Sequence, residues 1–200
     1  MEKIEIIIAT GNKDKIREYD ELFKDYPVIV KSLKDENVQL DVDETGTTFK
    51  ENAIIKAEYI AYKTNKLVIA DDSGICIHAL NDFPGVYSAR FMEGQPYSEK
   101  NKELNRRLEN HTDRTAHYTC AIAFVDPKKK ICEVFEGKCF GTIIEAIEGP
   151  HGFGYDPIFV PNGKNEPFSL ILDEEKNRMS HRGVATKLLM EYLEKNLMNR

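Results

Sequence analysis

Two adjacent acids follow a strongly apolar segment in the first half of the chain. Residues 66–70 are predicted to form a buried strand, and Asp71 and Asp72 come directly after them. Ligands of open α/β sheets bind outside the carboxyl ends of the strands, so both acids are expected at such an edge. Neighbouring carboxylates repel each other, and Mg²⁺, which prefers oxygen ligands, would relieve that repulsion. Considered alone, the two acids could equally cap the next segment or pair with a lysine.

A glycine-containing turn near the start of the chain is suited to binding phosphate. It consists of Thr10, Gly11, Asn12, Lys13, Asp14 and Lys15. The apolar segment 4–9 before the turn is predicted to be a strand, and Ile16, Tyr19 and Phe23 after it recur at helical spacing. Glycine lets the backbone approach a ligand, while a helix N-terminus and lysines favour an anion. Gly-Asn turns are also common helix caps, so this turn alone leaves both interpretations open.

The last third of the chain carries an aromatic loop and a basic pair. The loop consists of Gly152, Phe153, Gly154, Tyr155 and Asp156. The glycines would let the backbone pass beside a planar ligand, and the Phe153 ring could stack on a nucleobase. His181 and Arg182 follow Ser180, a predicted N-cap, and offer N–H donors to a base or a phosphate, with Lys176 shortly before them. Singly, such a loop is more often part of a core, and such a pair is more often on the surface.

The elements that would position these residues alternate between strands and helices. The expected strands are 3–9, 28–30, 66–70, 116–125, 131–136, 138–147 and 157–160, and the expected helices begin near residues 12, 48, 98 and 180. Ser98 is the expected N-cap of the third helix, and residues 126–130 are expected to form a hairpin turn. This order predicts one α/β domain over residues 1–200, in which a β-rich lobe at roughly 115–165 precedes the last helix.

Composition and charge exclude several classes of function. The 200 residues carry a net charge of -6 and no basic stripe, which argues against a nucleic-acid polymer as partner. No apolar run approaches the ~20 residues of a membrane span. Residues 4–9 are too short for a signal-peptide core and contain Glu5, and the four cysteines lack a CxxC spacing, so a cytoplasmic location is expected. The P-loop pattern of many nucleoside triphosphatases is also absent.

Six motifs occur in a defined order along the chain. They are Thr-Gly-Asn-x-x-Lys at 10–15, Glu-Thr-Gly-x-x-Phe-x-Glu-Asn-Ala at 44–53, Ala-Asp-Asp-Ser-Gly at 70–74, Phe-Pro-Gly-Val-Tyr-Ser-Ala-Arg at 83–90, Gly-Phe-Gly-Tyr-Asp-Pro-Ile-Phe at 152–159 and Glu-Glu-Lys-Asn-x-x-Ser-His-Arg at 174–182. This order closely resembles the inosine triphosphate pyrophosphatase family, whose members clear non-standard purine nucleotides. The resemblance runs almost from end to end of the chain.

The resemblance implies a fold, an activity and an assembly. The fold would be an elongated, two-lobed α/β structure with a mixed sheet and a central substrate cleft. The activity would be Mg²⁺-dependent hydrolysis of ITP, dITP and XTP to the monophosphate and pyrophosphate, which keeps these nucleotides out of DNA and RNA. The protein would act as a homodimer. Positioning and charge neutralisation would carry most of the catalysis, as is usual for phosphoryl transfer.

The resemblance also implies roles for particular residues. The triphosphate-binding turn would be residues 10–15, with Asn12 and Lys15 on the phosphates. Glu44 and Asp72 would be the Mg²⁺ carboxylates, and Asp72 would also be the general base, supported by Asp71. The remaining implied substrate contacts are Lys56, Ser73, Phe153, Gly154, Tyr155, Asp156, Lys176, His181 and Arg182. Within this set Phe153 would stack on the base, and the last three would contact the base edge or the phosphates.

One departure from the family pattern and two alternatives accompany this interpretation. The family usually has an acid two residues after the phenylalanine that precedes its Glu-Lys element. In this chain the phenylalanine is Phe168, and Leu170 stands in place of the acid. This departure affects a local contact and leaves the phosphate and metal motifs unchanged. A Maf-type nucleotide pyrophosphatase would run the same reaction on dTTP, UTP or modified nucleotides. A nucleotide-binding module without catalysis would not need the acids at 44, 71 and 72.

Overall fold

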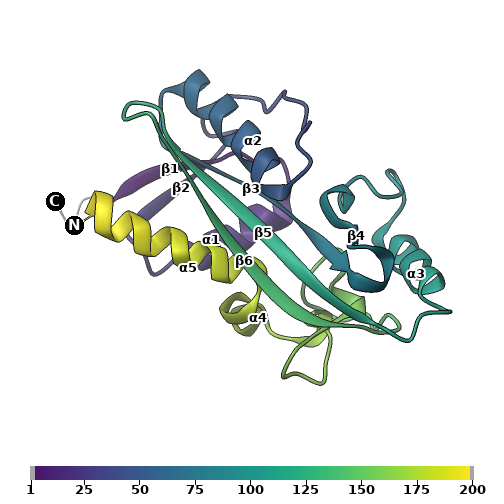
Figure 1. Cartoon of the computed structure of the whole chain (residues 1–200). Coiled ribbons are helices and arrows are strands. Elements are labelled where there is room, and N and C mark those ends of the chain that lie inside the picture. Colours follow the sequence, from purple (N-terminus) through teal and green to yellow (C-terminus); the bar gives the residue numbers. More distant parts are fainter. Residues whose placement is uncertain (1–2, 199–200) are drawn as a thin grey trace. The chain divides into compact units, whose positions relative to one another are not determined.

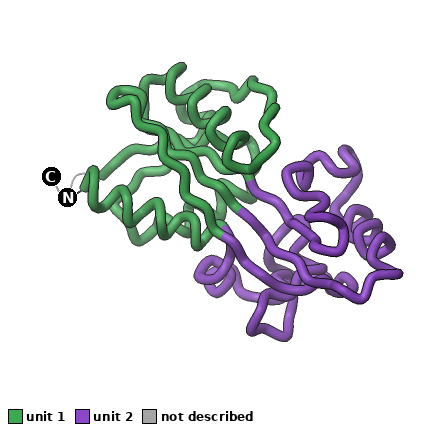
Figure 2. The backbone as a smooth tube through the Cα atoms, viewed as in Figure 1, with its two compact units in different colours: residues 1–72, 120–137, 182–200 green, residues 73–119, 138–181 purple. Residues whose placement is uncertain are grey.

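The structure is a computed structural model that describes residues 3–198 (Figure 1). The chain forms two compact units (Figure 2). Unit 1 contains the chain up to residue 72, residues 120–137 and the chain from residue 182, and unit 2 contains residues 73–119 and 138–181. The chain therefore passes from one unit to the other several times, and three strands contribute residues to both.

Strands and helices alternate in the first half of the chain, as predicted. The strands are β1 Ile4–Ile8, β2 Val28–Ser32, β3 Val68–Ile77, β4 Phe83–Pro84, β5 Thr115–Asp126, β6 Ile131–Ile143 and β7 Phe159–Pro161. The helices are α1 Lys13–Phe23, α2 Phe49–Thr64, α3 Tyr97–Arg107, α4 Asp173–Met179 and α5 His181–Leu193. Short 3₁₀ turns lie at 78–80, 85–87, 156–158 and 168–170, and a π-helical turn lies at 194–198.

The strands form one seven-stranded mixed sheet. Its order is β2-β1-β3-β5-β6-β7, with β4 paired to β3. β1 is parallel to β2 and to β3, since helices α1 and α2 provide the long connections that parallel strands need. β7 is antiparallel to β6, and β4 is antiparallel to β3. The sheet confirms the mixed α/β class predicted from the sequence.

Unit 1 has helices on both faces of its part of the sheet, with α2 on one face and α1 and α5 on the other (Figure 1). Successive side chains of a strand point to opposite faces. Accordingly Ile6 and Ile8 of β1 pack in the cluster that contains Tyr19 of α1, whereas Ile7 packs in the cluster that contains Ala57 of α2. The same alternation runs along β5. Residues 71 and 72 on β3 therefore face different helices, which decides the organisation of the site.

Unit 2 has its own hydrophobic core. Side chains from β3, α3 and β5 meet there, including Ile75, Leu104 and Tyr118. The Tyr118 ring makes an edge contact with Phe159, with centroids 4.8 Å apart. This core includes Tyr155, a residue of the predicted base-binding loop.

Three local predictions were wrong. β3 does not end before the two acids but continues to Ile77, because the charges of residues 71 and 72 are paired inside the fold. β6 is one strand through Gly137, since a glycine within a strand does not have to interrupt the ladder. The N-cap of α3 is Pro96, not Ser98, and no side chain caps that helix. Helix α4 was not predicted at all.

Two further predictions are confirmed. α2 begins as expected, with Thr48 as N-cap and Glu51 completing a capping box. Residues 127–130 form the predicted turn between β5 and β6.

Within residues 3–198, no helix combines the length and the apolarity that crossing a membrane requires.

Gly141 is the position at which we expect the packing of β7 on β6 to be most sensitive. A Cβ atom there would lie 2.3 Å from the Val160 carbonyl oxygen and 2.6 Å from the Phe159 ring. Because a backbone atom cannot move aside cheaply, we expect Gly141→Ala to lower the free energy of unfolding by about 1–3 kcal/mol. Gly11→Ala is the control, since a Cβ at residue 11 meets nothing within 4 Å. Urea denaturation of both variants measures the difference, and equal losses would contradict this packing argument.

Candidate active site

Asp71 lies at the centre of a buried charge cluster in unit 1. Its Oδ2 atom is 3.0 Å from Lys15 Nζ of α1 and 3.0 Å from Arg182 Nη2 of α5. The Cys120 thiol of β5 lies 3.7 Å from the same oxygen. Arg182 also pairs with Glu18 of α1, and its guanidinium lies over the Tyr19 ring at 5.8 Å. Two cations, Lys15 and Arg182, are thus paired with two anions, Asp71 and Glu18.

The cluster keeps Asp71 ionised. Burial alone would raise the pKa of the Asp71 carboxyl, but the Lys15 ammonium and the Arg182 guanidinium outweigh burial and lower that pKa well below its ordinary value. Buried charges are tolerated only when they are paired in this way. Asp71 therefore acts as an anchor that joins β3 to α1 and α5.

Asp72 faces the opposite side of β3 and meets helix α2. Asn52 Nδ2 donates a hydrogen bond of 3.0 Å to Asp72 Oδ2. Lys56 Nζ lies 3.9 Å from Asp72 Oδ1 and 3.3 Å from Glu44 Oε1. Burial raises the pKa of Asp72, although the Lys56 ammonium acts in the opposite direction. The two neighbouring acids therefore sit in electrostatically different environments, one neutralised by two cations and one loosely paired.

The loop that carries Glu44 is held in place by Asn52. The Gly46 N–H donates a hydrogen bond of 2.8 Å to Asn52 Oδ1, and a Cβ at residue 46 would lie 2.6 Å from that oxygen. One amide side chain thus binds the acidic loop with its oxygen and Asp72 with its nitrogen. Asn52 belongs to the motif at 44–53, but its bridging role depends on contacts that the motif does not show.

Glu44 and Asp72 could hold a metal ion together. Their carboxylates both lie within 4.0 Å of the single ammonium of Lys56, so they already surround a positive charge. Oxygen donors of this kind, one or two carboxylates per ion, are what Mg²⁺ uses in proteins. The donor set therefore fits the predicted ion.

The turn at residues 10–15 serves first as a helix cap. Asn12 Oδ1 accepts hydrogen bonds from the Asp14 and Lys15 amides at 2.9 and 3.3 Å, and Thr10 Oγ1 accepts one from the Asn12 amide at 3.2 Å. Lys13 is exposed, whereas Lys15 reaches Asp71. Nothing lies within 4 Å of the place where a Cβ of Gly11 would be, so the backbone is open to a ligand there. A phosphate role for this turn stays a prediction.

Asp156 organises the aromatic loop of unit 2. Its Oδ2 atom lies 2.7 Å from Lys176 Nζ and accepts a hydrogen bond of 2.8 Å from the Phe153 amide. Its Oδ1 atom accepts a hydrogen bond of 3.2 Å from the Tyr118 hydroxyl. Lys176 Nζ lies 4.9 Å from the centre of the Phe153 ring. Gly152, with a φ of 71°, comes so close to Asp156 that a Cβ would lie 2.3 Å from its Oδ2.

A pocket in unit 2 is lined in part by this loop. Its volume is about 370 Å³, and the lining includes Tyr97, Asn101, His151, Phe153 and Gly154. Pockets of roughly 300–1,000 Å³ accept small ligands. Asn101 Nδ2 donates to the Gly154 carbonyl at 3.3 Å, and its Oδ1 accepts no hydrogen bond from the part of the chain that the structure describes. Asn101 lies outside the six motifs, so the sequence gives no signal for its place in this pocket.

The other predicted residues of unit 2 differ in their surroundings. The Tyr155 hydroxyl donates a hydrogen bond of 2.6 Å to the Ser88 carbonyl, so this side chain connects the aromatic loop to the segment that contains Ser88. The His181 ring stacks on Tyr118 with centroids 4.6 Å apart. Ser73 is half-buried on β3. Arg182, the neighbour of His181 in sequence, belongs to unit 1 and is engaged by Asp71 and Glu18.

Comparison with known proteins decides the family. The model of the Ham1 family matches residues 6–192. The chain belongs to the Ham1 family. The family resemblance predicted from the six motifs is thereby confirmed.

Relatives and solved structures of this family match over almost the whole chain. The chain is 43% identical to the dITP/XTP pyrophosphatase of Leptospira interrogans, with 96% of this chain and 98% of that protein covered, and 45% identical to that of Staphylococcus epidermidis, with 95% and 96% covered. The structure of the Staphylococcus aureus Ham1 protein has a TM-score of 0.85 at 40% identity, covering 96% and 98%. The HAM1 protein of Coxiella burnetii has a TM-score of 0.87 at 36% identity, covering 96% and 99%.

The buried charge cluster predicts a large difference between two arginines. Arg182→Leu leaves Asp71 and Glu18 without their shared cation, and we expect it to destabilise the fold by about 3–5 kcal/mol. Arg178→Leu is the matched control, because Arg178 pairs with Glu174 on the exposed surface of α4, where such a pair contributes less than about 1 kcal/mol. Urea denaturation compares them, and a loss below 1 kcal/mol in Arg182→Leu would contradict the anchoring role of the cluster.

Proposed function

We propose that this chain hydrolyses non-standard purine nucleoside triphosphates, namely ITP, dITP and XTP, to the monophosphate and pyrophosphate. The observation that carries the proposal is that two adjacent carboxylates on β3 lie on opposite faces of the strand in different electrostatic surroundings. Asp71 is neutralised by Lys15 and Arg182, while Asp72 lies near Glu44 and Lys56 on the other face. Relatives at 43% and 45% identity are dITP/XTP pyrophosphatases, which supports the same reaction here.

Magnesium is the proposed cofactor, and Glu44 and Asp72 would hold it. When bound, the ion supplies positive charge to phosphate oxygens and lowers the pKa of a coordinated water. The chain itself holds Glu44 in reach of this position through the Gly46–Asn52 hydrogen bond. Asn52 orients Asp72 by donating a hydrogen bond to its Oδ2 atom.

Asp72 is the proposed general base. A water molecule attacks the α-phosphorus, its proton passes to the Asp72 carboxylate, and the bond from the α-phosphorus to the bridging oxygen breaks as pyrophosphate leaves. Asp71 is unsuited to this role, because two cations stabilise its ionised form and its Oδ2 is already shared between them. Lys13 and the start of α1 would neutralise the phosphates, and Gly11 would let the backbone approach them.

Unit 2 would recognise the base. Phe153 lines the pocket of about 370 Å³ and would offer its ring to the base, and Lys176 Nζ lies 4.9 Å from the centre of that ring. Hypoxanthine and xanthine carry a keto acceptor at position 6, where adenine carries an amino donor. A buried donor that faced the amino group would lose its partner, at a cost of about 1–3 kcal/mol. His181 and Arg182 remain proposed substrate contacts from the family resemblance.

The working form is proposed to be a cytoplasmic homodimer. Large apolar side chains of unit 2 that are exposed in the single chain support a second copy as partner: Tyr87 is 57% exposed, Phe140 52% and Leu172 62%. Light scattering on the purified protein gives its mass directly, and a monomer across micromolar concentrations would remove this part of the proposal.

A substrate panel tests the reaction and the base preference together. With Mg²⁺ and equal concentrations of ITP, XTP, ATP, GTP, dTTP and UTP, we expect monophosphate and pyrophosphate mainly from ITP and XTP. Chelation of Mg²⁺ should stop the release of both products. Preference for dTTP or UTP would keep the reaction but favour the Maf-type alternative. If nucleotides bind but none of the panel is hydrolysed, the result would favour a nucleotide-binding module without catalysis.

Two amide substitutions test the division of roles between the acids. We expect Asp72→Asn to lower kcat by about 10²–10⁴-fold, since it removes a general base, while stability changes little. Asp71→Asn, the matched variant one residue away, should instead lower the free energy of unfolding, because Lys15 and Arg182 lose their shared anion. Single-turnover rates and urea denaturation separate the effects. Near wild-type kcat in Asp72→Asn would remove Asp72 from the mechanism.

A further inference from the structure

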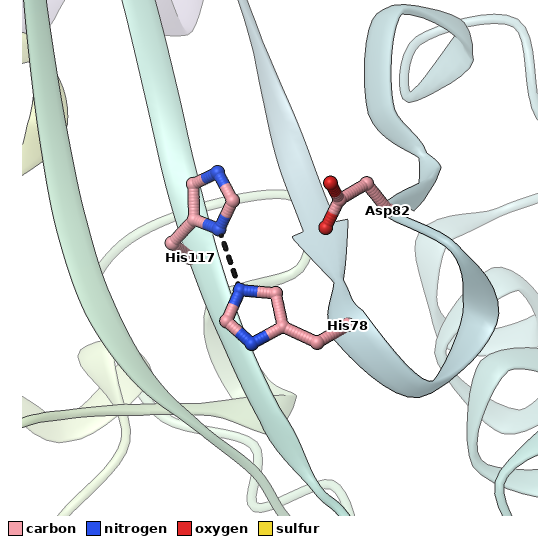
Figure 3. A group of neighbouring side chains, drawn as sticks. All are labelled: His78, Asp82 and His117. Atoms are coloured by element: carbon pink, nitrogen blue, oxygen red, sulfur yellow. Dashed lines mark hydrogen bonds between the residues drawn. The ribbon is translucent and has the colours of Figure 1, made fainter.

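Two histidines and an aspartate of unit 2 form a cluster outside the six family motifs. They are His78, Asp82 and His117, and their ligand atoms all lie within 4.8 Å of one another (Figure 3). His78 Nε2 and His117 Nδ1 are only 2.9 Å apart. The Asp82 carboxylate is turned toward the two rings (Figure 3). Nothing in the proposed hydrolysis uses these residues.

The chain after β3 folds so that Asp82 returns to the side of His78. Asn81 and Asp82 both have left-handed backbone conformations, with φ values of 54° and 60°. Their amides donate hydrogen bonds of 3.0 Å to the carbonyls of His78 and Ile77. Asn and Asp tolerate this conformation better than most residues. The acid is thus placed beside His78 by a defined turn and beside His117 by the neighbouring strand β5.

A hydrogen-bonded chain fixes the tautomer of His78. Its Nδ1 lies 2.8 Å from Thr115 Oγ1, which in turn donates a hydrogen bond of 2.6 Å to Asp113 Oδ1. Because the Thr115 hydroxyl proton is directed to Asp113, the Thr115 oxygen accepts the proton of His78 Nδ1. The lone pair of His78 is therefore on Nε2, the atom that faces His117 and Asp82. Histidines that bind metals are commonly oriented through their second nitrogen in this way.

The chemistry of the cluster favours a transition-metal ion over a hard cation. Imidazole nitrogens suit nickel, copper and zinc, whereas magnesium and calcium prefer all-oxygen sites. Burial lowers the pKa of His117, and the positive charge of Lys138 on β6 acts in the same direction, while metal ligation needs the neutral form of an imidazole. Bonds of about 2.0–2.1 Å from one ion to both nitrogens, at their separation of 2.9 Å, subtend about 90°. That angle suits tetragonal or octahedral coordination without movement of the rings, and tetrahedral zinc after slight opening.

We propose that His78, His117 and Asp82 form a binding site for a divalent transition-metal ion such as Ni²⁺, Cu²⁺ or Zn²⁺. The ion would replace the hydrogen bond between the two rings and link the turn after β3 to β5, and the proton of His117 Nδ1 would move to Nε2 of the same ring by exchange with water. His78 and Asp82 are exposed, so the ion can enter from solvent and keep water ligands. The site is independent of the proposed carboxylate site for Mg²⁺, which belongs to unit 1 and contains no imidazole.

Titration of tag-free protein with each metal tests the site. Calorimetry should give one ion per chain for Ni²⁺, Cu²⁺ and Zn²⁺, and no binding of Mg²⁺ that depends on His78. His78→Ala and His117→Ala should each weaken binding by more than about 100-fold, and Thr115→Val by about 10–100-fold. His111→Ala, an exposed histidine outside the cluster, is the matched control and should change nothing. All variants carry Cys132→Ser, because an exposed thiol would itself bind these metals.

A spectroscopic measurement separates ligation from a merely structural role. The Cu²⁺ complex should show two coordinated imidazole nitrogens by electron paramagnetic resonance, and one after His78→Ala. His78 is exposed, so this variant is expected to fold even if His117→Ala does not. Unchanged affinity in His78→Ala, or loss of binding in His111→Ala, would overturn the proposal. A spectrum without two imidazole ligands would also overturn it.

Discussion

The compensation of one buried charge is the constraint on which unit 1 depends. Asp71 has no access to water, so its ionised carboxylate requires cations inside the fold, and Lys15 and Arg182 supply them at 3.0 Å each. Glu18 balances the second cation. Three elements that are far apart in sequence, α1, β3 and α5, therefore converge on a single oxygen. The turn at residues 10–15, which is proposed to bind phosphate, directly precedes α1, so this cluster also determines where the turn lies relative to β3.

Strand alternation turns one dipeptide into two functions. Because Asp71 and Asp72 point to opposite faces of β3, the first meets the helices α1 and α5 and the second meets α2. The first acid joins the strand to two helices, and the second, the proposed general base, lies next to Glu44, Lys56 and the orienting amide of Asn52. Where two neighbouring acids lie in environments that shift their pKa values in opposite directions, that difference is a common basis for assigning acid and base roles.

Unit 2 uses a buried carboxylate in a comparable way. Asp156 receives Lys176, the Tyr118 hydroxyl and the Phe153 amide, and so shapes the loop that presents the Phe153 ring. Burial of acids with dedicated partners is thus the common principle of both units. The cluster of His78, Asp82 and His117 differs from it, since two of its members are exposed and none belongs to a family motif.

The order of motifs in the sequence was enough to predict the family, the α/β class and the alternation of the first strands and helices, because these depend on local periodicity and on short stretches of residues. The role of each acid was not predictable, since it depends on partners such as Arg182, which lies 111 residues from Asp71. The continuation of β3 through two acids, the absence of a side-chain cap at Ser98 and the functions of Asn52 and Tyr118 were likewise decided by tertiary contacts. A buried charged residue in a strand is tolerated only where the fold brings it a counter-charge, and no local sequence pattern shows where that counter-charge comes from.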